Sequence, residues 1–217
     1  MSETALEVVS FETGPLQENA WLVIDRATGA AALVDPGDEG DRLIAAIEHE
    51  RVRLEAIWLT HAHFDHIGAV AALRRRFDVP VYLHEGDLRI FEAGPFQAAS
   101  YGLPFEGDEP PSQRLTEGQG LVLGGLSFTV MHTPGHSPGH VVIHGHGIAL
   151  VGDCLFAGSV GRTDLPFGNA LELGRSLDRI VALPPDTRVL PGHGPATTVG
   201  EERRTNPWLP ELIGLTR

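Results

Sequence analysis

Hydrophobic residues fall in short runs along this chain, and turns containing glycine or proline separate one run from the next. Short runs of this kind predict β-strands. Longer segments in which apolar residues recur every three or four positions predict amphipathic helices. The predicted strands lie at residues 5–11, 20–25, 31–35, 56–60, 81–84, 121–123, 127–131, 140–144, 148–151 and 188–190. The predicted helices lie at residues 39–50, 67–77, 170–183 and 199–204.

The predicted strands form two groups, one in each half of the chain, and the helices follow or interrupt them. The first three strands are joined by short turns and are expected to form an antiparallel meander. Two β-rich halves with helices outside predict an α+β fold, an αβ/βα sandwich in which two sheets pack face to face. With 217 residues and 42% hydrophobic content, the chain can form one such domain over residues 1–217.

Residues 92–114 break this pattern. The segment contains the pairs Gly94-Pro95, Leu103-Pro104 and Pro110-Pro111. Because proline and glycine interrupt regular structure, the segment is expected to be an irregular surface excursion and a candidate lid.

The charge of the chain limits its partners and its compartment. There are 16 Lys and Arg against 29 Asp and Glu, a formal net charge of -13, which disfavours nucleic acid and anionic membranes as partners. The single cysteine, Cys154, excludes an intramolecular disulfide and fits a reducing compartment. The acidic start, residues 1–7, does not resemble a signal peptide, and no apolar run approaches the roughly 20 residues that span a bilayer. A soluble, cytoplasmic protein is therefore expected.

Metal-competent side chains cluster directly after the predicted strand 56–60. The run contains His61, His63, Asp65 and His66. Imidazole and carboxylate groups bind ions such as zinc, iron and manganese, and a strand end lets the backbone turn them toward one point. The cluster therefore predicts a metal site. The alternative is a polar loop whose histidines cap the following helix.

Further candidate ligands stand at the ends of apolar runs, each directly after a glycine. They are His136 in Thr-Pro-Gly-His, Asp153 in Leu-Val-Gly-Asp and His193 in Leu-Pro-Gly-His. A preceding glycine allows the backbone to turn sharply and to approach a metal. The repeated arrangement predicts that these residues belong to the same site.

The order His-x-His-x-Asp-His, then His, Asp and His, resembles the metallo-β-lactamase superfamily over nearly the whole chain. Within that superfamily, residues 155–166, 190–195 and 202–206 are similar to the short, glyoxalase II-like hydrolases. Spacing alone does not divide the ligands between metals. The resemblance implies that His61, His63 and His136 hold one metal, that Asp65, His66 and His193 hold the other, and that Asp153 bridges both.

The resemblance also implies an activity, the hydrolysis of a thioester such as S-lactoylglutathione. Two divalent ions about 3.5–4 Å apart share a hydroxide, because they lower the pKa of water from about 15.7 toward 7. Zinc is the expected metal, and iron or manganese suits the same ligands. Asp65 is expected to be catalytic as well, by orienting the hydroxide. The expected partner is a small-molecule acyl-thiol substrate.

Residues beside the predicted ligands have two interpretations each. Arg162 is expected to bind a substrate carboxylate, or else to pair with Asp164. Asp35 either orients a ligand histidine or starts a turn before proline. His140 is expected to lie behind the ligands or in the core, and Cys154 is expected to be a buried apolar side chain.

Other members of the superfamily supply the alternative functions. Typical glyoxalase II enzymes carry a further C-terminal helical region that contacts glutathione, for which this chain leaves no room, so a different thiol carrier is an alternative. A mononuclear iron persulfide dioxygenase would use His61, His136 and Asp153 as its facial triad. A lactonase would use the same ligands on a ring ester. A non-catalytic binding module is disfavoured because every ligand position is retained.

Overall fold

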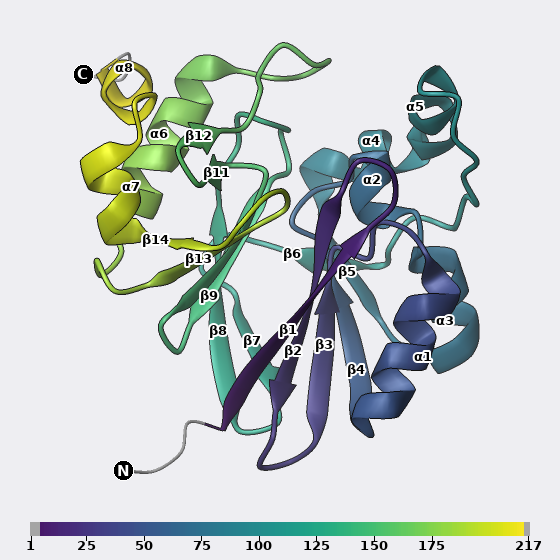
Figure 1. Ribbon diagram of the computed structural model, residues 1–217. Coiled ribbons are helices and arrows are strands. Elements are labelled where there is room, and N and C mark those ends of the chain that lie inside the picture. The colour runs from purple at the N-terminus through teal and green to yellow at the C-terminus, as the bar shows by residue number, and fades with distance from the viewer. Residues whose placement is uncertain (1–4, 215–217) are drawn as a thin grey trace.

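The computed structural model describes residues 5–214, and it shows two six-stranded sheets packed face to face (Figure 1). The first sheet has the order β1 (Leu6–Thr13), β2 (Glu18–Asp25), β3 (Ala30–Val34), β4 (Arg53–Trp58), β5 (Val81–His84) and β6 (Gln113–Leu115). The second has the order β14 (Thr197–Thr198), β13 (Arg188–Pro191), β10 (Ile148–Gly152), β9 (Val141–Gly145), β8 (Leu126–His132) and β7 (Gly120–Leu123). Strands β11 (Leu155–Phe156) and β12 (Ser159–Val160) form a separate hairpin.

Helices cover the outer faces of both sheets, which confirms the predicted αβ/βα sandwich (Figure 1). On the first sheet these are α1 (Gly40–Glu50) and α3 (Val70–Phe77), and on the second α6 (Ala170–Val181), α7 (Val199–Thr205) and α8 (Leu209–Gly214). The short α2 (Phe64–Ile67), the 3₁₀ turn η1 (Glu85–Asp87), α4 (Leu88–Glu92) and α5 (Gly94–Ser100) lie near one end of the sheets. No helix within residues 5–214 is long and apolar enough to cross a membrane.

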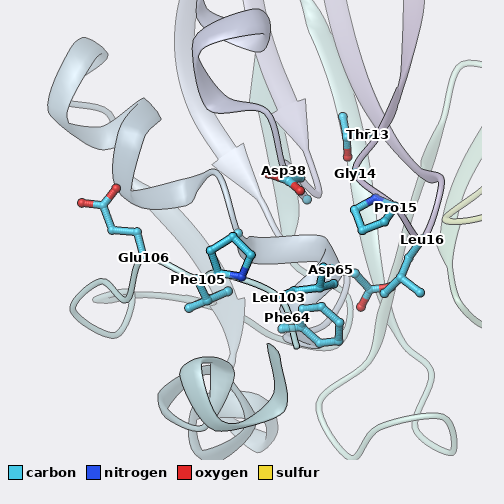
Figure 2. A pocket seen from close by; sticks show the side chains of 13 residues that line it. Thr13, Gly14, Pro15, Leu16, Asp38, Phe64, Asp65, Leu103, Phe105 and Glu106 are labelled. Atoms are coloured by element: carbon cyan, nitrogen blue, oxygen red, sulfur yellow. The ribbon is translucent and has the colours of Figure 1, made fainter. Parts of the chain in front are cut away.

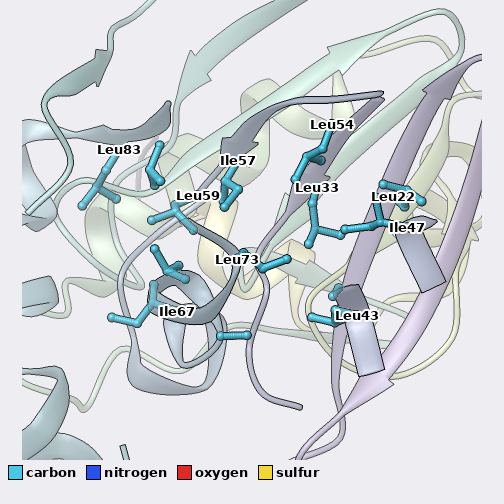
Figure 3. Packing of buried hydrophobic residues seen from close by; sticks show 14 of the residues in the cluster. Leu22, Leu33, Leu43, Ile47, Leu54, Ile57, Leu59, Ile67, Leu73 and Leu83 are labelled. Atoms are coloured by element: carbon cyan, nitrogen blue, oxygen red, sulfur yellow. The ribbon is translucent and has the colours of Figure 1, made fainter. Parts of the chain in front are cut away.

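The core has three apolar layers because the sheets are covered on both faces. Strand β2 is buried along its whole length, and its side chains alternate between layers. Leu22 lies in the layer under α1 and α3 (Figure 3). Ile24 belongs to the same layer, whereas Trp21 and Val23 lie between the sheets. A third layer fills the space between the second sheet and α6 to α8. This packing fixes the ends of the central strands, from which the site is built.

The predicted helix over residues 67–77 is two helices in the structure. Ile67 ends α2, and α3 begins at Val70. The interruption comes from packing, because the backbone at Gly68 lies directly against the carbonyl of Gly37, and Ala69 N donates to Pro36 O over 3.0 Å. Apolar periodicity alone does not reveal a contact of this kind.

The expectation of an irregular excursion over residues 92–114 is wrong in part. Pro95 stands in the first turn of α5, a position that suits proline because its missing N–H has no helical partner there. The irregular stretch is residues 101–112, and β6 then joins the first sheet. The pattern also did not predict η1, α4, β6, β11, β12, β14 and α8. The first four residues of the predicted acidic start, 1–4, lie outside the described residues.

The carboxyl ends of five central strands meet at one edge of the sandwich. Strands β3 and β4 are parallel in the first sheet, and β8, β10 and β13 run in one direction in the second. Hydrogen bonds join the sheets at this edge, from Val141 N to Thr60 O at 2.8 Å and from Asn19 N to Gly192 O at 2.7 Å. Loops at such an edge are held on a rigid frame, as ligand-binding loops of layered α/β proteins are.

Candidate metal centre

The predicted ligands leave different strands and converge at this edge. His61, His63, Asp65 and His66 follow β4, His136 follows β8, Asp153 follows β10, and His193 follows β13. The ligand atoms of His61, His63 and His136 lie within 4.8 Å of one another, and so do those of Asp65, His66 and His193. The structure therefore brings together the two groups that the resemblance implies.

Asp153 lies between the two groups. Its Oδ1 is 3.4 Å from His66 Nε2, and its Oδ2 is 3.6 Å from His136 Nε2 and 3.7 Å from His193 Nε2. One carboxylate thus faces a histidine of the first group and two histidines of the second. This is the position that a ligand shared by two ions requires.

Hydrogen bonds behind the histidines aim one ring nitrogen of each into the centre. His61 Nδ1 faces Thr60 Oγ1 at 3.1 Å, His136 Nδ1 faces Arg162 O at 2.8 Å, and His193 Nδ1 faces Leu16 O at 3.1 Å. Each of these Nδ1 atoms donates, which directs Nε2 into the centre as the nitrogen that would bind a metal. The anchors fix both the tautomer and the direction of the ring.

Asp35 holds the cluster from behind. It accepts from Thr60 N at 2.7 Å, from Thr60 Oγ1 at 2.6 Å and from His66 Nδ1 at 3.2 Å. An oxygen of Asp35 also comes within 4.8 Å of ligand atoms of His61 and His66. Because both Asp35 oxygens accept these hydrogen bonds, the residue is placed to orient His66. The geometry therefore favours an orienting role for Asp35 over the role of a residue that only starts a turn.

Buried atoms without hydrogen-bond partners test whether the centre fits a metal. In the described part of the chain these are His61 Nε2, His66 Nε2, Asp153 Oδ1 and Glu18 Oε1. Leaving a buried polar atom unpaired costs about 1–3 kcal/mol, so such atoms are rare. The first three belong to predicted ligands and point into the centre, and a cation would satisfy all of them.

The protonation states also fit a cation. Burial, reinforced by neighbouring imidazoles, lowers the pKa of His61 well below its usual range, and burial and His136 lower the pKa of His63 to about 3. These rings are neutral, the form that binds metals. Burial lowers the pKa of His66, but Asp153 outweighs burial and raises this pKa well above its usual range. Burial raises the pKa of Asp153, but His66 outweighs it and holds the pKa of Asp153 far below the usual range of an aspartate. A bound metal would replace the His66 proton as the positive partner of Asp153.

Glycine serves the three later ligands in two different ways. Gly135 and Gly152 have φ of +140° and +45°, so the expected sharp turn before His136 and Asp153 is present. Gly192 has no positive φ. A Cβ there would overlap Asp153 Oδ1 and the His66 ring, so this glycine is required for space rather than for its backbone conformation.

Sequence reasoning missed two buried carboxylates next to the centre. Asp87 accepts from Ala62 N at 3.0 Å, from Ser137 Oγ at 2.7 Å and from Gly139 N at 2.6 Å, so it joins the two ligand-bearing loops. Glu18 Oε1 is 3.8 Å from His66 Nδ1, on the side away from the ligand atoms. Neither residue stands in a recognisable motif. The only local signal is Gly86, which separates Glu85 from Asp87 and indicates a turn there.

His140 and Cys154 lie behind the centre as expected. His140 is fully buried, bonds Thr133 Oγ1 through Nδ1 at 2.9 Å, and accepts from Asp153 N through Nε2 at 3.1 Å. Burial raises the pKa of the Cys154 thiol to about 12. Cys154 is therefore neither a thiolate ligand nor a nucleophile at neutral pH.

A cavity of about 730 Å³ opens onto the centre and is lined by His63, Asp65, His136, Asp153 and His193. Arg162 also lines it, which places this predicted substrate-binding residue at the cavity. Its Nε and Nη2 atoms donate to both carboxylate oxygens of Asp164, at 2.7 and 2.8 Å. The guanidinium thus has a partner of its own, and its role toward substrate stays a prediction.

Two packed sheets with imidazole and carboxylate ligands at their strand ends define an αβ/βα metalloprotein. Comparison with known proteins gives the family. The model of the metallo-β-lactamase superfamily matches residues 13–193, and the chain belongs to this superfamily of metallohydrolases.

The chain is similar to a named hydrolase and to solved structures of this superfamily. Hydroxyacylglutathione hydrolase GloC of Haemophilus influenzae is 40% identical over 198 residues, which cover 89% of this chain and 93% of GloC. Among solved structures, TTHA1623 in a di-iron-bound form is 47% identical with a TM-score of 0.86, covering 93% of this chain and 100% of that one. The BLEG-1 B3 metallo-β-lactamase is 40% identical with a TM-score of 0.88, covering 94% and 99%.

Proposed function

We propose that the protein is a two-metal hydrolase that cleaves a thioester of a small acyl group. The observation that carries the proposal is the position of Asp153 between two groups of ligand atoms, on the wall of a cavity large enough for a substrate. The similarity to hydroxyacylglutathione hydrolase GloC supports a thioester as the substrate.

In this proposal the chain provides every ligand. His61, His63 and His136 hold one ion, Asp65, His66 and His193 hold the other, and Asp153 is shared. Two ions so placed supply Lewis acidity, which lowers the pKa of a bound water and polarises the carbonyl. The ligand set suits zinc, iron and manganese alike, and we propose zinc, with iron supported by the di-iron form of TTHA1623.

Asp65 receives the proton of the attacking water. Burial opposes its ionisation, but the hydrogen bond from His193 and the charge of His66 lower the pKa of Asp65. It is therefore a carboxylate at neutral pH, with Oδ2 3.3 Å from His193 Nε2. Since Asp65 lines the cavity, its carboxylate reaches the space where water and substrate meet.

Cys154 does not act as the nucleophile, because its buried thiol stays protonated at neutral pH.

The remaining residues of the cavity position the substrate. Phe64, Phe156 and Tyr101 line the space in front of the ligands, and apolar walls limit the access of water beyond the one that reacts.

Metal analysis combined with a thioester assay tests the proposal. Elemental analysis of freshly purified protein is expected to give two metals per chain, and the loaded protein is expected to release free thiol from S-lactoylglutathione. A fully loaded protein that releases no thiol from a panel of acyl thioesters would overturn the proposal. Oxygen uptake with sulfite formation from glutathione persulfide would replace it with the dioxygenase alternative.

Hydrolysis of a β-lactam is a second candidate. The similarity to the BLEG-1 B3 metallo-β-lactamase, at a TM-score of 0.88 over 94% of the chain, favours it. A chromogenic cephalosporin assayed beside S-lactoylglutathione separates the two candidates. Under the leading proposal, kcat/KM for the thioester exceeds that for the cephalosporin by at least about tenfold. This ratio measures how much better the site stabilises the transition state of the thioester than that of the cephalosporin.

A further inference from the structure

The larger cavity is bounded by two separate walls. One consists of α4, α5 and Tyr101, and the other of the β11–β12 hairpin with the loop that follows it. The first wall contributes Arg89, Ile90, Ala93, Phe96, Gln97, Ser100 and Tyr101, and the second contributes Phe156, Val160, Arg162, Leu165, Pro166 and Phe167. These residues lie beyond the ligands, where they contact the parts of a substrate that do not react.

The first wall is one face of a helical segment. Positions 89, 93, 96 and 100 are spaced by three or four residues, so their side chains share a face across α4 and α5. The aromatic rings at the mouth are unusually open for their size, with Phe96 79%, Tyr101 53% and Phe167 63% exposed. Exposed aromatic rings around a cavity mark a surface that is covered when a ligand binds.

Of the two arginines that line this cavity in the described part of the chain, Arg89 lacks a carboxylate partner. Arg162 is held by Asp164, and every other charged residue of the lining except Arg89 is a predicted ligand. Within residues 5–214, the Arg89 guanidinium forms no ion pair and no side-chain hydrogen bond. On a chain with a formal net charge of -13, a free guanidinium is a local attraction for an anion.

A smaller cavity on the other side of Asp65 has carboxylates in its lining (Figure 2). Its volume is about 400 Å³, and Leu16, Phe64 and Asp65 line both cavities. Asp38 and Glu106 also line it, and Arg75 pairs with Glu106. Among residues 5–214 no arginine or lysine lines this space, so its carboxylates disfavour an anionic group there relative to the larger cavity.

We infer that Arg89 binds the anionic group of the thiol carrier, while Ala93 and Phe96 on the same wall contact the chain that links this group to the thioester. The inference rests on the proposed thioesterase function. The larger cavity accommodates the thiol carrier, which is the larger part of the substrate, and the smaller cavity accommodates the acyl group. The substrate class is therefore an acyl thioester of an anionic thiol.

Two thioesters that differ only in charge test this assignment. S-Lactoylglutathione carries free carboxylates, and its dimethyl ester does not. Arg89→Ala is expected to raise KM for S-lactoylglutathione about tenfold, the range for a charge-assisted hydrogen bond, and to change KM for the dimethyl ester less than about twofold. Arg89→Glu is expected to raise KM for the anionic substrate further, because it repels the carboxylates.

Arg203→Ala is the matched control, since it removes an exposed arginine of α7 that is not among the lining residues. It is expected to leave both KM values unchanged. Equal changes for the two substrates in Arg89→Ala, or none for either, would overturn the inference. A change in Arg203→Ala as large as that in Arg89→Ala would also overturn it, because a long-range effect of net charge would then explain the result.

Binding measured without turnover separates this inference from the proposed function. S-Butylglutathione has a thioether in place of the thioester and cannot be hydrolysed. Calorimetry is expected to show that Arg89→Ala weakens its binding about tenfold and leaves binding of its dimethyl ester within about twofold. If the wild type hydrolyses no thioester, the proposed function fails. If Arg89→Ala binds both thioethers as the wild type does, the inference about Arg89 fails.

Discussion

At the scale of single residues, the centre depends on what lies behind each ligand. Thr60, Leu16 and the carbonyl of Arg162 accept from the Nδ1 atoms of three ligand histidines, and Asp35 accepts from a fourth. Of these partners only Asp35 could be proposed from the sequence, since the carbonyls of Leu16 and Arg162 reach their histidines through the approach of distant segments. The ligands themselves follow from residue type and spacing, whereas their orientation follows only from the fold.

The shared position of Asp153 predicts an asymmetry between ligand variants. Asp153→Ala removes the carboxylate that faces both groups and is expected to lose both metals and all turnover. His193→Ala removes a half-buried ligand of one group and is expected to lose mainly one metal. Elemental analysis after dialysis against metal-free buffer measures the difference.

The two variants control for each other, since both truncate a side chain of the same cavity. Equal metal content in the two variants would contradict a shared role for Asp153. Circular dichroism of both variants shows whether a loss of metal reflects a loss of fold.

At the scale of elements, Asp87 links the ligand loop after β4 to the loop after β8. Asp87→Ala leaves the buried Ala62 N and Gly139 N without their acceptor, and it is expected to lower the free energy of unfolding by about 3 kcal/mol. Urea unfolding measures the change. Asp186→Ala removes an exposed carboxylate and is the control, with an expected change within about 0.5 kcal/mol. Similar values for the two variants would show that Asp87 does not join the loops.

A stacked histidine pair joins β5 of one sheet to β8 of the other. The His84 and His132 rings are 4.1 Å apart with an interplanar angle of 13°, and burial, followed by the charge of His132, lowers the pKa of His84. Below pH 6.5 the unfolded chain binds a proton that folded His84 resists. The contribution of His84 to stability is therefore complete above pH 6.5 and is lost as the pH falls through its lowered pKa.

His84→Phe keeps the ring and removes the titration. Its free energy of unfolding is expected to fall less steeply than that of the wild type between pH 6.5 and pH 5, as measured by urea unfolding at several pH values. His49→Phe, at an exposed position of α1, is the control and is expected to keep the wild-type slope. An unchanged slope in His84→Phe would show that this ring does not titrate differently in the folded state.

The elements show how far the sequence predicts the fold. Apolar runs predicted β2, β4 and β10, which are buried on both faces over most of their length, whereas β8 alternates between buried and exposed positions. The break between α2 and α3 could not be predicted, since it depends on contact with the distant Gly37. Strands as short as β11, β12 and β14 contain too few residues for any periodicity.

At the scale of the whole molecule, the centre lies where both sheets end, so its ligands connect the two halves of the sandwich. His61 and His63 belong to the first sheet, whereas His136, Asp153 and His193 belong to the second. In each predicted ligand group, residues from both sheets meet. An ion held by these predicted ligands would therefore connect the two halves of the sandwich.

Removal of the metals is consequently expected to destabilise the whole fold. Without a cation, His61 Nε2, His66 Nε2 and Asp153 Oδ1 are buried without hydrogen-bond partners, and the sheets are joined only by the apolar layer between them and by the hydrogen bonds at this edge. Chelation should lower Tm, and added metal should restore it. When free metal is 100-fold above its Kd, binding at one site should raise the free energy of unfolding by about 2.7 kcal/mol. Calorimetry of the chelated protein during zinc titration measures both effects. In Asp153→Ala the same titration should restore little, because the carboxylate that faces both groups is missing. A Tm that does not respond to chelation in the wild type would show that the two sheets are held together without the centre.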